Sequence, residues 1–316
     1  MGRETDIQIM LSKIRDNIAK VLIGKDHVIE MVLAAYISGG HVLIEDVPGL
    51  GKTTLVTALA RSLDCSFQRI QFTPDVLPSD VTGFTSFNMK TGDREINFGG
   101  IMSQIVLADE INRTSPKTQS SLLEVMQEGQ VTIDGSTYPV PQPFIVLATQ
   151  NPVEQIGTYP LPEAQLDRFL MKISIGYPDR EEEIEILKRN KGARPLDSIE
   201  PVATAEDIIS LRKEHGNVIC AQPVMDYIVM ISEATRKDER ISLGVSPRGS
   251  LALMNAGMAC AMLKGRNYTL PDDIQLMVKP VLKHRIVLNT RTNLTRETPE
   301  TILESILRTI KVPAVS

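Results

Sequence analysis

The sequence predicts an α/β domain with a parallel β-sheet, residues 1–178, followed by a smaller all-α domain, residues 179–316. Two observations predict this division. Up to residue 175, short apolar segments alternate with helical patterns, and such alternation forms a parallel sheet covered on both faces. After Gly176-Tyr177-Pro178, only helical patterns remain. The five expected strands are residues 41–44, 67–72, 104–109, 144–149 and 170–175.

Helices and turns are expected before and between these strands. Residues 5–21 carry apolar side chains at helical spacing, and Asp26 can cap a second helix. Residues 73–100 look like a loop, with a hairpin turn expected at Thr91-Gly92-Asp93. Ser115-Pro116 opens a helix that Gly129 ends, and Asp134-Gly135 predicts a second hairpin turn. In the second domain, helical patterns cover residues 179–191, 204–215, 222–236, 248–264, 271–284 and 298–310.

The composition narrows the class of protein. The net charge of -5 argues weakly against a dedicated nucleic-acid binder. Cys65, Cys220 and Cys260 are far apart, so neither a disulfide framework nor a zinc site is indicated, and a reducing cytoplasm is expected. The longest apolar run, residues 31–37, is too short to cross a membrane.

A Gly-rich loop follows the first expected strand and is the strongest functional signal. Its backbone N–H groups and the start of the next helix can surround a phosphate. Lys52 would reach the β- and γ-phosphates, and the Thr53 hydroxyl would bind Mg²⁺. Asp46 stands where G-x-x-x-x-G-K-[ST] has its first glycine, so the alternative is a chance match in an ordinary turn. The loop residues expected to bind nucleotide are Pro48, Gly49, Leu50, Gly51, Lys52, Thr53 and Thr54.

Two carboxylates, Asp109 and Glu110, end the apolar strand 104–109. At the carboxyl edge of a parallel sheet, beside the phosphate loop, Asp109 is placed to hold Mg²⁺ and Glu110 to activate a water. The alternative is a strand that runs into a solvated acidic turn.

Three further polar residues are candidates for the same chemistry. Asn151 follows strand 144–149 and could bind the γ-phosphate or the attacking water, although Asn-Pro is also an ordinary turn. Arg168 ends a helical segment and could be an arginine finger, or it could pair with the helix dipole. Arg248 lies at a helix start, where a cation is unfavourable, which hints at a bound anion; an ordinary surface arginine is the alternative.

Several longer motifs occur in a fixed order. This set resembles the MoxR family of AAA+ ATPases, which is related to the magnesium-chelatase ATPase subunit, and the resemblance covers nearly the whole chain. It includes Ser246-Pro247-Arg248 and His284-Arg285-Ile286 in the second domain. The other matching segments are residues 48–53, 108–113, 115–119, 148–152 and 159–169.

The resemblance implies a role for each candidate. Walker A ends at Gly51-Lys52-Thr53 and Walker B at Asp109-Glu110; the form Glu-Asp-Val-Pro-Gly around Asp46 is tolerated in this family. Sensor 1 would be Asn151, the arginine finger Arg168 and sensor 2 Arg248. Ile23 and Gly24 would pack on adenine. The resemblance also implies a sheet order of 5-1-4-3-2, a helix-2 insert at 84–100, a hairpin before sensor 1 at 130–143, and a ring that is usually a hexamer.

We therefore expect a Mg²⁺-dependent ATPase that hydrolyses ATP between subunits of a ring and remodels a protein partner. In MoxR-like proteins that partner is typically a von Willebrand factor A-domain protein, often during the assembly or metallation of a complex. One rival is a DNA-acting AAA+ motor, which should have a basic hairpin; residues 130–143 contain no Lys or Arg, and residues 84–100 contain only Lys90 and Arg94. The other rival is a nucleotide-switched scaffold with negligible turnover.

Overall fold

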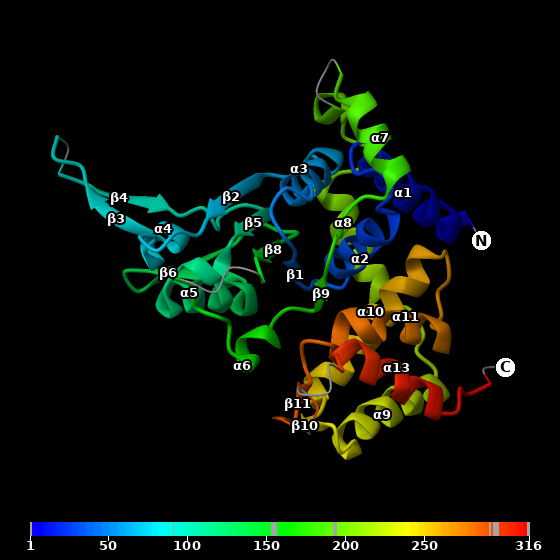
Figure 1. Ribbon diagram of the computed structural model, residues 1–316. Coiled ribbons are helices and arrows are strands. Elements are labelled where there is room, and N and C mark those ends of the chain that lie inside the picture. Colours follow the sequence, from blue (N-terminus) through cyan, green and yellow to red (C-terminus); the bar gives the residue numbers. More distant parts are fainter. Residues whose placement is uncertain are drawn as a thin grey trace.

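The computed structural model describes residues 2–90, 92–152, 157–191, 195–290, 292 and 297–314, with side chains described from residue 7 onward. Figure 1 shows an α/β body, a helical part beside it, and a long hairpin that projects from the body. Within the described residues, no helix is long and apolar enough to span a membrane.

A five-stranded parallel sheet forms the centre of the body, in the order β2-β5-β8-β1-β9. With the strands numbered along the chain this is 5-1-4-3-2 read from one edge, as the family resemblance implied. The three central strands are almost entirely buried, as expected for a parallel sheet with both faces covered. The strands are β1 (Val42–Glu45), β2 (Phe67–Gln71), β5 (Ile105–Asp109), β8 (Ile145–Gln150) and β9 (Met171–Ile173).

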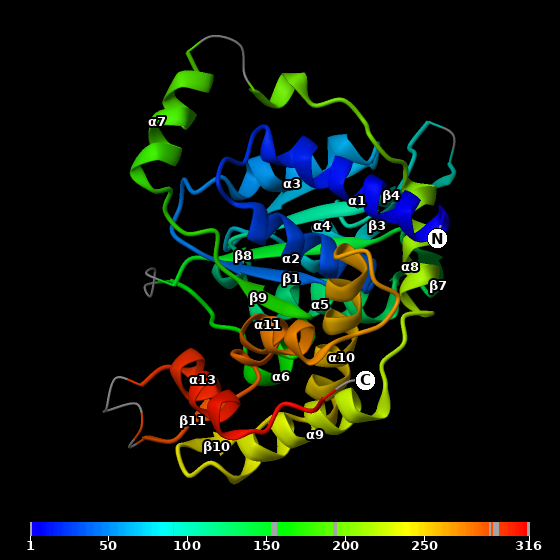
Figure 2. The same cartoon turned by 90° about the vertical axis from the view of Figure 1, so that its right-hand side faces the viewer.

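Helices cover the two faces of this sheet, and alternate strand residues pack against each layer. Leu107 and Leu147 share one core with α1, α2 and α3, whereas Val106 and Val146 share the other core with α5. Figure 2 shows α1, α2 and α3 on one side of the strands and α5 on the other. These helices are α1 (Gly2–Ala19), α2 (Asp26–Ile37), α3 (Lys52–Ser62) and α5 (Pro116–Glu128).

Two hairpins extend from the body. The hairpin expected within residues 73–100 is present, although Thr91 in its turn lies outside the described residues. The loop expected before it contains a five-residue helix, α4, in which the Asp80 side chain caps the Leu77 N–H at 2.8 Å; a helix this short leaves no periodic pattern. These elements are α4 (Pro78–Thr82), β3 (Gly83–Phe87), β4 (Arg94–Phe98), β6 (Gln130–Ile133) and β7 (Ser136–Pro139), with a 3-10 turn at Ile111–Arg113.

The second part of the chain contains helices and one small antiparallel ribbon, β10–β11. The prediction of an all-α domain was therefore wrong in this detail, because strands of three and two residues are too short to show alternation. The elements after residue 178 are α7 (Arg180–Arg189), α8 (Ala205–His215), α9 (Gln222–Lys237), β10 (Ile241–Leu243), α10 (Pro247–Leu263), α11 (Pro271–Leu282), β11 (Val287–Leu288) and α13 (Pro299–Thr309), with a 3-10 turn at Pro195–Ser198. The short helix α6 (Glu163–Leu166) precedes β9 and belongs to the first part.

The chain passes from β9 into α7 through Gly176-Tyr177-Pro178, and we propose residue 178 as the end of the α/β domain. The helix α8 nevertheless packs back on α2, where Arg212 Nε donates to the carbonyl of Tyr36 at 2.9 Å. The helical part is thus docked firmly on the sheet domain.

Candidate nucleotide-binding site

The Gly-rich loop leaves β1 at the carboxyl edge of the sheet and leads directly into α3. Gly49 and Gly51 have φ angles of 87° and 85°, a left-handed conformation that side chains other than glycine rarely adopt. Lys52 is the first residue of α3, and its ammonium donates to the backbone carbonyl of Asp46 at 2.7 Å. Burial lowers the pKa of Lys52, while the nearby carboxylates of Asp46, Asp109 and Glu110 oppose that effect.

Asp46, the departure from the glycine consensus, has a structural role. Its buried carboxylate accepts hydrogen bonds from Ser174 Oγ at 2.7 Å, from the Ile175 N–H at 2.5 Å and from the Gly176 N–H at 3.4 Å. The start of the phosphate loop is thereby tied to the segment that leaves β9. Sequence reasoning missed this contact, since it joins segments about 130 residues apart.

A cavity of about 390 Å³ lies between the loop and the ends of β5 and β8. It brings together the candidates that sequence reasoning placed at this edge. The residues around it are Pro48, Gly49, Gly51, Lys52, Thr53, Thr54, Arg69, Gln71, Asp109, Glu110 and Asn151.

Thr149 contacts both acidic residues at the end of β5, Asp109 through its carboxylate and Glu110 through its backbone. Its buried hydroxyl donates to Asp109 Oδ1 at 2.6 Å and accepts from the backbone N–H of Glu110 at 2.9 Å. Glu110 has a left-handed backbone, with φ of 58°, a conformation that costs free energy in a non-glycine residue and is concentrated at functional sites. The hydrogen bond that the Glu110 N–H donates to Thr149 therefore helps to hold the Glu110 backbone where the strand ends.

Two side chains of β2 contact the same carboxylates, and sequence reasoning missed both. Arg69 donates to Asp109 Oδ2 at 2.6 and 3.1 Å, and Gln71 donates to Glu110 Oε2 at 2.9 Å. Arg113 also lies 3.3 Å from Glu110. The alternation of Arg69 and Gln71 on one face of a strand was visible in the sequence, but their partners depend on the neighbour of β2.

The oxygen atoms at this site fit Mg²⁺. Thr53 offers a hydroxyl and Asp109 a carboxylate, both hard oxygen ligands, beside the loop that would hold phosphates. Among the described residues, no group of three or more His, Cys, Asp or Glu side chains could hold a metal. Mg²⁺ usually keeps several waters and takes substrate phosphates as ligands, so one hydroxyl and one carboxylate from the protein would serve it.

A second cavity, of about 450 Å³, adjoins the first and is mainly apolar. Gly49, Gly51 and Thr54 line both cavities, whereas Ile23 and Leu50 line only this one. Gly24 does not line it; a Cβ at Gly24 would collide with the Glu182 side chain, so this glycine permits the close approach of α7. The other residues around the cavity are Val21, Leu22, Lys25, Ile175, Gly176, Pro178, Ile186, Asn190, Pro195 and Leu196.

Arg168 and Arg248 lie together, but away from the phosphate loop of their own chain. Both line a third cavity, of about 290 Å³, with Gly40 and His41, which precede β1. The phosphate loop follows β1, so the two sites lie at opposite ends of this strand. They are separated by roughly 13 Å, the length of a four-residue strand. The structure therefore does not bring either arginine to its own chain's phosphate site.

These features define a P-loop ATPase of the AAA+ class. The phosphate loop follows β1, the two carboxylates end β5 in a sheet of order 5-1-4-3-2, and a helical lid follows the sheet domain. Comparison with known proteins agrees. Residues 41–171 match the family described as "ATPase family associated with various cellular activities (AAA)", and residues 233–306 match the AAA lid domain.

Whole-chain relatives narrow this class. Protein YeaC of Bacillus subtilis is 50% identical, with 99% of this chain and 98% of that protein covered. Chaperone MoxR1 of Mycobacterium tuberculosis is 40% identical, with 95% of this chain and 81% of that protein covered. A crystal structure from Cytophaga hutchinsonii superposes with a TM-score of 0.91 at 39% identity, covering 99% of this chain and 98% of that one. The chain belongs to the MoxR family of AAA+ ATPases.

Proposed function

We propose that this ATPase hydrolyses ATP in a Mg²⁺-dependent reaction and uses the free energy to remodel a protein partner. The observation that carries the proposal is the convergence of Lys52, Asp109, Glu110 and Asn151 on one cavity beside the phosphate loop. ATP fits the two adjoining cavities, with its phosphates near Lys52 and its base in the apolar one.

Each polar group has a distinct task in this proposal. The loop amides and Lys52 bind the phosphates, and Glu110 accepts the proton of the attacking water. Asn151 orients that water or the γ-phosphate. Thr53 and Asp109 would hold Mg²⁺, which when bound offsets charge on the β- and γ-phosphate oxygens. Catalysis is then mostly positioning and charge stabilisation.

The site is composite, shared by two subunits. Arg168 and Arg248 are too far from their own phosphate loop to serve it, so we assign both to the nucleotide of a neighbouring subunit. An arginine supplied in trans stabilises the charge of the transition state. Every subunit then both gives and receives arginines, as in a ring of head-to-tail contacts, and the ring and its hexameric size follow from the family resemblance.

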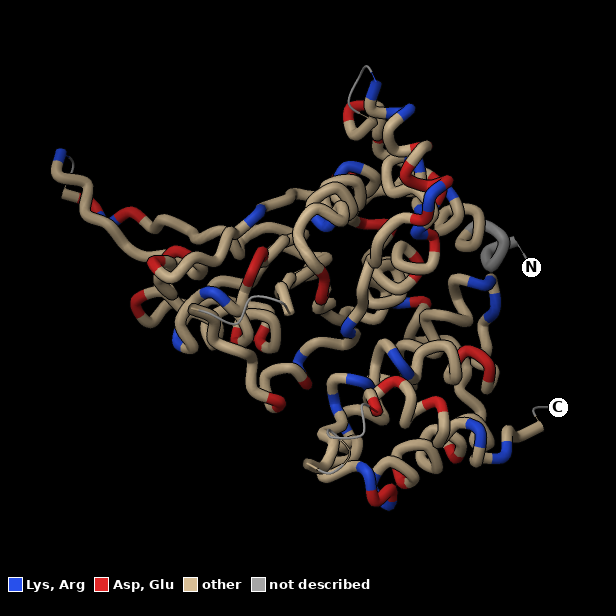
Figure 3. Tube along the Cα trace, in the orientation of Figure 1, with Lys and Arg blue, Asp and Glu red and all other residues tan. Residues whose placement is uncertain are grey.

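The partner is a protein rather than DNA. The β3–β4 hairpin exposes Phe87, Ile96 and Phe98 on one face, an apolar surface of the kind that binds proteins. Figure 3 shows acidic and basic residues interspersed along the trace, and the β6–β7 hairpin carries no Lys or Arg. By family resemblance we propose a von Willebrand factor A-domain partner, and remodelling, maturation or metal-cofactor insertion as the task. The three free cysteines suit a reducing cytoplasm.

The test separates binding from hydrolysis. Glu110→Gln keeps the shape of the side chain and removes the base, so ATP affinity by calorimetry should persist while turnover falls by about 10²–10⁴-fold. Glu233→Gln, an exposed lid carboxylate paired with Lys237, is the control and should keep wild-type turnover. Unchanged turnover in Glu110→Gln would place the base elsewhere, and negligible wild-type turnover would favour the scaffold.

A further inference from the structure

Arg285 reaches from the lid into the segment that carries Arg168. It lies three residues after α11, and its side chain is only 3% exposed. Its guanidinium donates to Asp167 Oδ1 at 2.7 Å, to the carbonyl of Phe169 at 2.7 Å and to the carbonyl of Leu170 at 3.0 Å. One lid side chain therefore holds residues on both sides of Arg168.

The chemistry of the guanidinium explains why this position suits arginine. Residues 167–170 connect α6 to β9, and the carbonyls of Phe169 and Leu170 both accept from Arg285. A guanidinium offers five N–H donors in a rigid plane, enough to bind a carboxylate and two carbonyls at once, whereas an ammonium is a single point charge. The geometry of residues 167–170 is thus fixed by several bonds to one buried group.

Arg285 also packs against the start of α10, where Arg248 lies. A Cβ at Gly249 would lie 3.0 Å from Arg285 Cδ, so the two residues are in close contact. Asp167 bridges the two lid arginines: its Oδ1 binds Arg285, and its Oδ2 lies 4.0 Å from Arg248 Nε. Arg168, Arg248 and Arg285 all line the cavity at this edge of the sheet.

We propose that Arg285 is a positioning residue that locks the segment carrying Arg168 to the helix carrying Arg248, so that both arginines meet the neighbouring subunit's γ-phosphate as one rigid unit. The inference rests on the composite site proposed above. A misplacement of about 1 Å at a reacting centre can cost about 10²-fold in rate, which is why a residue with no contact to nucleotide can control turnover.

The experiment compares Arg285→Met with Arg168→Ala in the full-length chain. Both variants should bind ATP with wild-type affinity by calorimetry, because the phosphate loop lies at the opposite edge of the sheet. Both should lose turnover, Arg285→Met by about 10²-fold. Mixing either one with Glu110→Gln subunits should restore activity, because some junctions then pair an intact Glu110 with an intact arginine unit.

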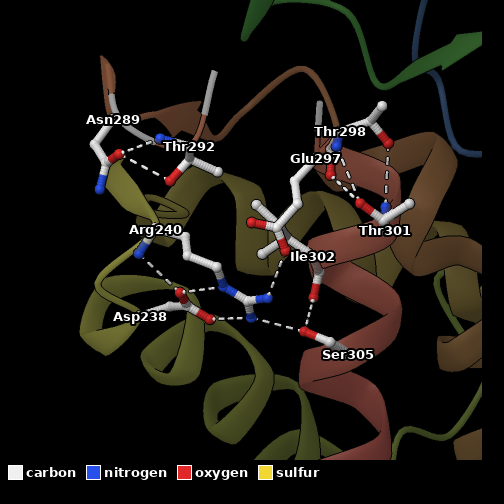
Figure 4. Close-up of polar contacts among 9 residues, drawn as sticks. All are labelled: Asp238, Arg240, Asn289, Thr292, Glu297, Thr298, Thr301, Ile302 and Ser305. Atoms are coloured by element: carbon white, nitrogen blue, oxygen red, sulfur yellow. Dashed lines mark hydrogen bonds and ion pairs between the residues drawn. The ribbon is translucent and has the colours of Figure 1, made fainter. Parts of the chain in front are cut away.

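A matched control is available in the lid. Figure 4 shows Arg240, which binds Asp238 at 2.7 Å, Glu297 at 3.1 Å and Ser305 at 2.7 Å, without touching residues 167–170. Arg240→Met removes a comparable network that joins the β10 end of the lid to α13. It should lower the thermal unfolding midpoint and keep wild-type turnover.

The outcomes distinguish the two proposals. Wild-type turnover in Arg285→Met overturns the inference, as does lost turnover that mixing fails to restore under conditions that restore Arg168→Ala. Failure of Arg168→Ala itself to recover, in rings shown to exchange subunits, overturns the composite site. If Arg285→Met does not fold, Asp167→Asn, which keeps the volume and removes the charge facing Arg285, is judged by the same mixing criterion.

Discussion

Replacing Asp46 with Gly recreates the consensus phosphate loop, yet the structure predicts that this change is harmful. The Asp46 carboxylate accepts three hydrogen bonds from Ser174, Ile175 and Gly176, and all of them are lost. The Ile175 N–H is buried and would be left without its acceptor.

The magnitude follows from these contacts. Hydrogen bonds to a charged group contribute about 1.5–3 kcal/mol, and an unsatisfied buried donor costs about 1–3 kcal/mol. The desolvation of the carboxylate is relieved at the same time, so we expect a net loss of about 2–4 kcal/mol in the free energy of unfolding. At about 2–4 °C per kcal/mol for a large domain, the unfolding midpoint should fall by about 4–16 °C.

Scanning calorimetry of Asp46→Gly, Asp46→Ala and Asp46→Asn measures this loss. The free energy of unfolding should be reduced in both the Gly and the Ala variant. It should be lower for Gly by about 0.5–1 kcal/mol, because glycine loses more backbone entropy on folding. The stability of the Asn variant should lie between that of the Ala variant and that of the wild type, since the Asn side-chain carbonyl can still accept a hydrogen bond from the Ile175 N–H. A consensus Gly variant as stable as the wild type would show that Asp46 does not hold the loop.

Three further outcomes are expected. Lys52→Ala should abolish tight ATP binding by calorimetry with the far-UV circular dichroism spectrum unchanged, and wild-type affinity would contradict the phosphate-loop assignment. Arg69→Met should lower the Mg²⁺ concentration for half-maximal turnover by up to about fivefold. The half-exposed ion pair between Arg69 and Asp109 is worth up to about 1 kcal/mol, and in the variant it no longer competes with Mg²⁺ for the carboxylate. An identical Mg²⁺ titration would argue against this competition. ATPase activity should show no stimulation by single- or double-stranded DNA, and stimulation that falls steeply with salt would instead support the DNA motor.

The elements of the fold that repeat a pattern over several residues could be predicted from the sequence. The alternation of strands and helices predicted the parallel sheet. Lys52, Asp109, Glu110 and Asn151 all follow or end such strands, and parallel strands share a carboxyl edge, so the four residues were expected to lie together. The structure places all four around one cavity. The short elements α4, β10 and β11 were missed because they hold too few residues for a period to appear.

The remaining features depend on contacts between distant segments. Arg69 and Gln71 face Asp109 and Glu110 only because β2 lies beside β5, and the pairing of Asp46 with Ile175 requires the position of β9. The proximity of Arg168 and Arg248 depends on how the lid docks, which no local pattern encodes. Local sequence patterns thus predicted the residues expected to contact the phosphates. The residues that hold those side chains in place became visible only in the folded structure.

The central claim is that one ATP site takes Lys52 and Glu110 from one subunit and Arg168 from the next. The most direct measurement is the ATPase rate of rings mixed from Arg168→Ala and Glu110→Gln subunits, as a function of the mixing ratio. An arginine supplied in trans is worth about 10³–10⁵ in rate, so activity should rise from near zero for either variant alone to a maximum at intermediate ratios. A rate that stays at the level of the separate variants at every ratio, in rings shown to exchange subunits, would contradict the claim.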